Sequence, residues 1–106
     1  MTLTKVKKNI PAFKRLVRAN PTEAKQIIRK GKKDFIDSIS ECSLNVLNGN
    51  VEISPERKRK LQRYKKQIRF ISKKQSSLKK RKDVLQKGGF LNILVPVLGA
   101  ITKLLS

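Results

Sequence analysis

Fourteen cationic side chains between residues 57 and 82 are the groups in this sequence best suited to binding chemistry. Residues 55–87 carry a net charge of +13, with Glu56 and Asp83 as the only acids. A solvated helix face usually places Glu and Lys four residues apart, and cations at this density repel one another unless an anion neutralises them. The pattern predicts contacts with nucleic-acid phosphates; an anionic membrane and a nuclear import signal are the alternatives. The predicted phosphate-binding residues are Arg57, Lys58, Arg59, Lys60, Arg63, Lys65, Lys66, Arg69, Lys73, Lys74, Lys79, Lys80, Arg81 and Lys82.

Most familiar catalytic chemistry is excluded by residue type. The 106-residue chain has one cysteine, Cys42, and no histidine or tryptophan. It therefore cannot form an internal disulfide, a multi-thiolate zinc site, a histidine-based triad or a histidine-ligated metal centre. We predict a protein that is not an enzyme and that uses no metal or cofactor. Cys42 lies among apolar positions and is predicted to be a small buried hydrophobe rather than a reactive thiol.

The net charge of +20 is distributed unevenly along the chain. Residues 1–33 sum to +10 and residues 34–54 to −4, whereas residues 88–106 hold a single charge, on Lys103. An acidic, apolar interruption and an apolar end are not features of a uniformly disordered basic tail. The expected organisation is a basic amphipathic arm over 1–19, a helical core domain over 20–75, a basic linker or short helix over 76–89, and a hydrophobic segment over 90–106.

Apolar spacing predicts helices and no sheet. The stripe from Phe35 to Leu47 has steps of three and four residues, and Leu61, Tyr64, Ile68 and Ile71 repeat that spacing after Ser54-Pro55. Packed together they would form a helical hairpin. The fold class is therefore all-α, a small helical bundle or hairpin core with basic arms and a hydrophobic C-terminal segment. Expected helices cover about residues 10–17, 21–30, 32–48, 55–71 and 77–87.

Caps and breakers support these helices. Asn20 before Pro21, with Glu23 three residues after the cap, predicts a helix start, and Ser54 and the Ser76-Ser77 pair predict two more. Gly31, Gly49 and the Gly88-Gly89 pair predict ends.

Base-specific recognition has little support in the sequence. The basic residues surround the possible recognition helices rather than gather at one short face. The single tyrosine, Tyr64, lies on the apolar stripe, so we do not expect bases to stack on it. Recognition by shape and charge is the predicted mode.

The last seventeen residues form an apolar segment. They only just reach the length of a membrane-spanning helix, and Pro96, Gly99 and Lys103 interrupt them. A segment apolar on every face needs more surrounding protein than we expect this chain to supply. We therefore predict that it inserts into a bilayer leaflet, or docks into a capsid or self-association groove. The predicted contact residues are Phe90, Leu91, Ile93, Leu94, Val95, Val97, Leu98, Ile101, Leu104 and Leu105. The basic first twenty residues predict no secretory signal.

Residues 86–101, which read Gln-Lys-Gly-Gly-Phe-Leu-Asn-Ile-Leu-Val-Pro-Val-Leu-Gly-Ala-Ile, resemble the end of the adenovirus late core protein X family, the precursors of the small basic peptide mu. Residues 42–50, Cys-Ser-Leu-Asn-Val-Leu-Asn-Gly-Asn, are similar to a segment of the short basic late proteins of adintoviruses and Maverick/Polinton elements. The adenovirus resemblance covers about the last fifth of the chain, and the second would cover residues from about 25 onward. The sequence departs from the adenovirus family in being rich in Lys rather than Arg and in having a helical centre.

The resemblance implies a virion core protein that condenses double-stranded DNA in the host nucleus. It also implies a precursor that a viral cysteine protease cuts after Gly-Gly, here after Gly88-Gly89 and before Phe90. The two glycines could equally serve only to end a helix. Two alternatives come from other functional classes: a membrane-active protein that binds anionic lipid, and a minor capsid protein that tethers the genome to the shell through its tail.

Overall fold

The computed structural model describes residues 4–73 and 75–105, with side chains for 6–73 and 75–104. This part of the chain is all-α, as predicted, and contains eight helices and no strand. Its extents are 30 × 27 × 26 Å. The helices are α1 (Thr4–Lys8), α2 (Ile10–Arg18), α3 (Pro21–Lys30), α4 (Lys33–Leu47), α5 (Pro55–Gln62), α6 (Lys65–Ile71), α7 (Leu78–Gln86) and α8 (Phe90–Leu105).

The predicted caps start three of these helices. The side chains of Asn20, Ser54 and Ser77 accept hydrogen bonds from backbone N–H groups three residues later, at the starts of α3, α5 and α7. Gly49 follows α4 with a φ of +79°, a left-handed conformation that favours glycine. Gly31 follows α3, and close packing explains the glycine at this position. Its backbone is extended, but a Cβ there would lie 2.6 Å from the ring of Phe35.

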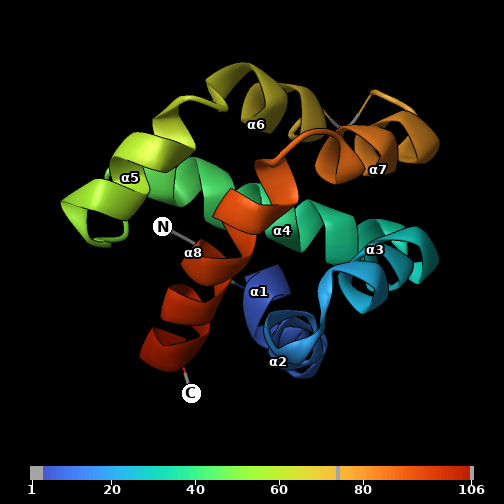
Figure 1. The fold of residues 1–106 in the computed structure, drawn as a ribbon, viewed down its shortest axis with the longest axis horizontal. Coiled ribbons are helices and arrows are strands. Elements are labelled where there is room, and N and C mark those ends of the chain that lie inside the picture. Colours follow the sequence, from blue (N-terminus) through green and yellow to red (C-terminus); the bar gives the residue numbers. More distant parts are fainter. Residues whose placement is uncertain (1–3, 74, 106) are drawn as a thin grey trace.

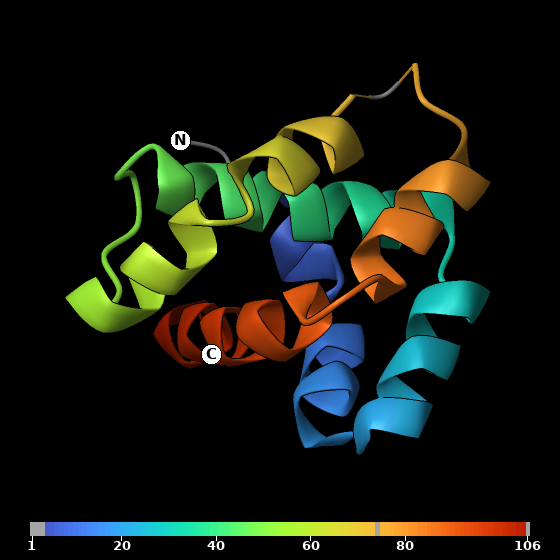
Figure 2. The same ribbon diagram turned by 45° about the horizontal axis from the view of Figure 1, so that its top comes forward.

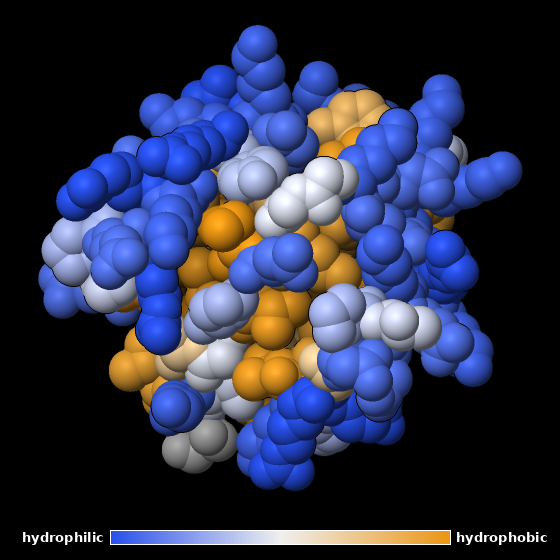
Figure 3. Space-filling view, in the orientation of Figure 1, coloured by the Kyte–Doolittle hydropathy of each residue, from blue (hydrophilic) through white to orange (hydrophobic). Residues whose placement is uncertain are grey.

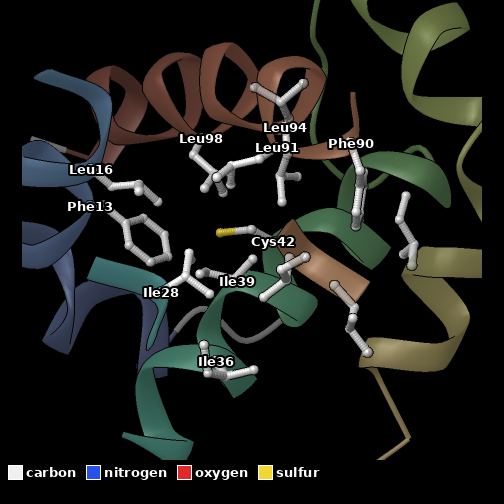
Figure 4. Packing of buried hydrophobic residues seen from close by; sticks show 14 of the residues in the cluster. Phe13, Leu16, Ile28, Ile36, Ile39, Cys42, Phe90, Leu91, Leu94 and Leu98 are labelled. Atoms are coloured by element: carbon white, nitrogen blue, oxygen red, sulfur yellow. The ribbon is translucent and has the colours of Figure 1, made fainter. Parts of the chain in front are cut away.

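The two longest helices, α4 and α8, form the centre of the molecule (Figures 1 and 2). Figure 4 shows Leu91, Leu94 and Leu98 of α8 pointing toward Cys42 of α4, with Phe13 and Leu16 of α2 closing one side. Helices α5, α6 and α7 follow one another over α4, while α2 packs against α8. One hydrophobic core therefore joins both ends of the chain.

Helix α8 is part of the core and not the separate hydrophobic segment that the sequence predicted. Among the described side chains it contributes six of the twenty buried hydrophobic residues, and it packs against α2, α4, α5 and α7. Neighbours on several sides supply the surrounding protein that the apolar segment needs. No single described helix is long and apolar enough to cross a bilayer, and α7 with α8 passes on length and composition only as a pair bent by 95°.

Helices α1 and α2, in the predicted N-terminal arm, also belong to the core rather than to a separate arm. Val6, Phe13 and Leu16 are fully buried. The Phe13 ring meets the edge of Phe35 on α4, with 5.7 Å between ring centroids. Val17, which follows Leu16 on α2, is exposed.

The expected continuous helix over 55–71 is two helices. It breaks between Gln62 and Lys65, where Tyr64 has a non-helical φ of −108° and ψ of 24°. The Tyr64 ring stacks on Phe90 at the start of α8, with 5.1 Å between centroids and 18° between ring planes. The break lets both helices bury their apolar side chains, Leu61 on α5 and Ile68 on α6.

Candidate nucleic-acid interface

Helices α5, α6 and α7 form an arch over α4 (Figures 1 and 2). Each buries only one or two apolar side chains, among them Leu61, Ile68, Ile71 and Leu85. These anchors hold the arch on the core, and most of the cations on these three helices are exposed. We call the exposed cations of α5 to α7 and of the turns that join these helices the cationic arch.

Ten of the predicted phosphate-binding residues are exposed in this arch and in the turns that join its helices. Lys58 and Lys82 are half-buried, and Lys74 lies outside the described residues. The exposed residues are Arg57, Arg59, Lys60, Arg63, Lys65, Lys66, Arg69, Lys73, Lys79 and Lys80.

Few of these cations have an acidic neighbour. The ion pairs that join described side chains are Lys60–Glu56 at 3.5 Å, Lys33–Asp37 at 2.8 Å and Arg81–Asp37 at 2.6 Å. Only the first lies on the exposed arch, where solvent makes such a pair weak. The cationic arch therefore presents positive charge that the folded chain leaves almost uncompensated.

Arg81 is a correction to the predicted phosphate-binding set. Its side chain is 1% exposed, its Nη2 donates to Asp37 Oδ1 at 2.6 Å, and its Nε donates to the carbonyl oxygen of Ile71 at 2.7 Å. A guanidinium enclosed in this way cannot reach a phosphate while the fold is intact. Arg81 instead ties α7 to α4 and to the end of α6.

The carboxylate that receives Arg81 stays ionised although it is buried. Burial raises the pKa of Asp37, but hydrogen bonds from Lys33 and Arg81 outweigh that effect and lower the pKa from 3.8 to about 2. The pair is thus a buried, charge-assisted cross-link between two residues that are 44 positions apart in the sequence.

Lys82 also has a partner within the protein. Its Nζ donates to the carbonyl oxygen of Arg29 at 2.7 Å, in the last turn of α3. The Arg29 Nε in turn donates to the side-chain oxygen of Gln86 at 3.0 Å. A cation at the carboxyl end of a helix is stabilising. Lys82 therefore helps to join α7 to α3, and its ammonium is less available to phosphate than those of Lys79 and Lys80.

Further exposed cations lie outside the predicted set. The net charge of +10 over residues 1–33 was the signal for them, but no single run among them stood out. Figure 3 shows hydrophilic side chains around the rim of one face and hydrophobic side chains at its centre, over α8. The additional exposed cations of α1 to α3 are Lys7, Lys8, Lys14, Arg15, Arg18, Lys25, Arg29 and Lys30.

Cys42 and Tyr64, the other side chains considered for binding or reactivity, are both at least half-buried. Cys42 is fully buried, and burial, helped by Glu41, raises the pKa of its thiol to about 12. This confirms Cys42 as a buried hydrophobe. Within 4–73 and 75–105 no cluster of three or more His, Cys, Asp or Glu residues could hold a metal ion. Tyr64 is half-buried against Phe90, which occupies one face of its ring.

The predicted cleavage site and tail contacts have different exposures. Gly88 and Gly89 are exposed in the turn between α7 and α8, whereas Phe90 is fully buried. Most of the predicted membrane or capsid contacts are core residues in this fold, because they fill the space between α8 and its neighbours. Phe90, Leu91, Leu94, Val97, Leu98 and Ile101 are buried, Ile93 and Val95 are half-buried, Leu104 is exposed, and the Leu105 side chain lies outside the described residues.

No protein-family model matches the sequence, and neither a curated protein nor a solved structure matches it.

Proposed function

We propose that this protein binds double-stranded DNA through its phosphates, without reading base sequence, as a genome-condensing virion core component. The observation that carries the proposal is the cationic arch, in which ten exposed Lys and Arg side chains have almost no acidic partners. Phosphates supply the missing counter-charge, and binding releases the ions condensed on DNA. The virion setting rests on the resemblance of residues 86–101 to viral core proteins. The proposed location is the virion core and the host nucleus.

The size of the molecule supports a limited number of phosphate contacts. Its longest extent is 30 Å. A duplex of that length carries about 18 phosphate charges, of which roughly half face a protein on one side. About five to nine neutralised phosphates is therefore a consistent range, and the exposed cations of the arch suffice for it.

A salt titration on duplex DNA tests the proposal. We expect log K against log[salt] to have a slope of about −4.5 to −8, with similar affinity for unrelated sequences. A slope shallower than about −2, or strong preference for one duplex, would contradict it. The same titration on double-stranded RNA would measure the preference for DNA.

A charge-matched pair of variants tests whether the arch is the interface. Replacing Arg57, Arg59, Lys65 and Lys66 with Gln should make the slope shallower by about 3.6, if all four contact phosphate, and should weaken binding to all sequences alike. The control replaces four exposed cations of α2 and α3, Lys14, Arg15, Lys25 and Lys30, with Gln. Equal losses in the two variants would mean that the whole surface, not the arch, binds DNA.

The structure changes what cleavage after Gly88-Gly89 would do. The turn is exposed, so a protease could reach it, but α8 beyond it is held by six buried side chains. We propose that a cut here leaves α8 in place in the folded protein. No observation on the described residues favours the membrane-active or tail-tether alternatives, because the residues they require are mostly in the core.

A further inference from the structure

The exposed large hydrophobic side chains in the described part of the chain are Val17, 37% exposed, and Leu104, 66% exposed. They are 87 positions apart in the sequence, yet both line one groove of about 540 Å³ between α2 and α8, beside the start of α5. A single exposed apolar side chain is ordinary, but two that converge in one concave site need a different account.

The groove combines an apolar floor with a cationic rim. Pro96 and Ala100 of α8 join Val17 and Leu104 in lining it. Lys14 and Arg18 on α2, Arg57 on α5 and Lys103 on α8 also line it, and all four are exposed. The helix spacing explains this arrangement, because Lys14 and Arg18 flank Val17 on α2, and Pro96, Ala100 and Lys103 share one face of α8. A single acid, Glu52, lies among these cations.

We propose that this groove docks an acidic amphipathic helix of a partner protein. The apolar stripe of such a helix would cover Val17 and Leu104, and acidic residues on either side of the stripe would meet the cations of α2, α5 and α8. The groove shares Arg57 with the cationic arch, but its floor and its other cations, Lys14, Arg18 and Lys103, lie outside the arch. Docking of a partner helix therefore does not require DNA binding.

Other occupants fit the groove less well. A second copy of this chain would bring another +20 charge against the rim, and its acidic segment over 34–54 is largely built into α4. DNA offers no apolar stripe to the floor. An acyl chain would stay largely in water, because most of the lining residues are exposed and the groove cannot enclose it. A concave site also gives Val17 and Leu104 poor access to a flat membrane.

The test uses the full chain and two labelled peptides of identical composition, each about two heptads long. One carries leucines along a single stripe with glutamates elsewhere, and the other distributes its leucines around the helix. Fluorescence anisotropy should show at least about tenfold tighter binding of the first peptide. Equal affinities would overturn the proposal, because they would show that acidic chains simply adhere to a cationic surface.

A neutral double variant, Val17→Thr with Leu104→Gln, places the binding in the groove. It should weaken binding of the striped peptide at least about tenfold and leave the net charge and duplex DNA affinity unchanged. The matched control is Leu78→Gln, a half-buried leucine of α7 outside the groove. It should bind the peptide like the parent chain. Circular dichroism of each variant checks that the fold persists.

Two further measurements, of vesicle binding and of DNA binding, distinguish a protein-docking groove from a lipid site and from failure of the proposed DNA-binding function. Tight binding to phosphatidylglycerol vesicles that requires Val17 and Leu104, without peptide binding, would assign the groove to lipid and overturn the proposal. Peptide binding without affinity for DNA would instead support the groove and contradict the proposed DNA-binding function. Loss of peptide affinity in Leu78→Gln equal to that in the double variant would also overturn the groove assignment.

Discussion

At the residue scale, we expect substitutions in the buried pair of Asp37 and Arg81 to lower the free energy of unfolding strongly. Asp37→Ala leaves the Arg81 guanidinium buried without its carboxylate, which we expect to cost about 3–5 kcal/mol of unfolding free energy. Replacing both residues with Leu should cost much less, since no charge is then left unpaired. Urea unfolding measures both, with Asp34→Ala, an exposed acid on the same helix, as the control. Equal losses for Asp37→Ala and Asp34→Ala would contradict the buried pair.

The same pair predicts how stability depends on pH. The pKa of Asp37 is lowered in the folded state from 3.8 to about 2. Because the unfolded chain takes up the proton at the higher pH, this contribution is complete above about pH 4 and is lost as the pH falls toward 2. The loss should be on the order of 2 kcal/mol. Urea unfolding at pH 6 and pH 2.5 checks it, and in Asp37→Asn the difference between the two pH values should be smaller by most of that amount.

At the element scale, α4 shows how a helix with many polar residues can be buried on most sides. Ser38, Ser40 and Ser43 are buried, and each hydroxyl donates to a carbonyl oxygen of α4 itself, at 2.6, 2.8 and 2.8 Å. Hydrogen bonds within the helix remove the cost of burying these groups. The helix therefore accepts neighbours beyond its apolar stripe, and α1, α5, α6, α7 and α8 all pack on it.

This position makes α4 the element whose apolar stripe is most sensitive to charge. Ile39 is fully buried among apolar side chains, so Ile39→Asp would enclose a carboxylate without a cationic partner. We expect a loss of several kcal/mol, a large part of a small domain's stability, and collapse of helical circular dichroism without DNA. Thr22→Asp, at an exposed position in the first turn of α3, is the control. An Ile39→Asp variant as helical and heat-resistant as the parent would show that this stripe does not face a core.

At the scale of the whole molecule, we predict that the chain needs its C-terminal helix to fold. Residues 1–89 lack six of the twenty hydrophobic side chains that are buried in the described part of the chain, including Phe90, which stacks on Tyr64. Expressed alone, they should lose cooperative thermal unfolding, because a domain this small has little stability in reserve. The full chain, cut after folding at a protease site engineered into the exposed Gly88-Gly89 turn, should keep both pieces together on gel filtration. A cooperative melt of residues 1–89 like that of the full chain would restore the separate-tail model.

The sequence by itself determined what depends on neighbouring residues and on composition. Asn20, Ser54 and Ser77 cap helices and Gly49 ends one, because these signals act within about one helical turn. The charge of the arch was also visible, since most cations in a dense basic run must stay in water. Only the tertiary structure decided that Arg81 turns inward to Asp37, that α8 lies in the core, and that Val17 and Leu104 share a groove. Each of these depends on groups more than 40 residues apart in the chain, and a helical period tells which side chains share a face but not which distant helix covers that face.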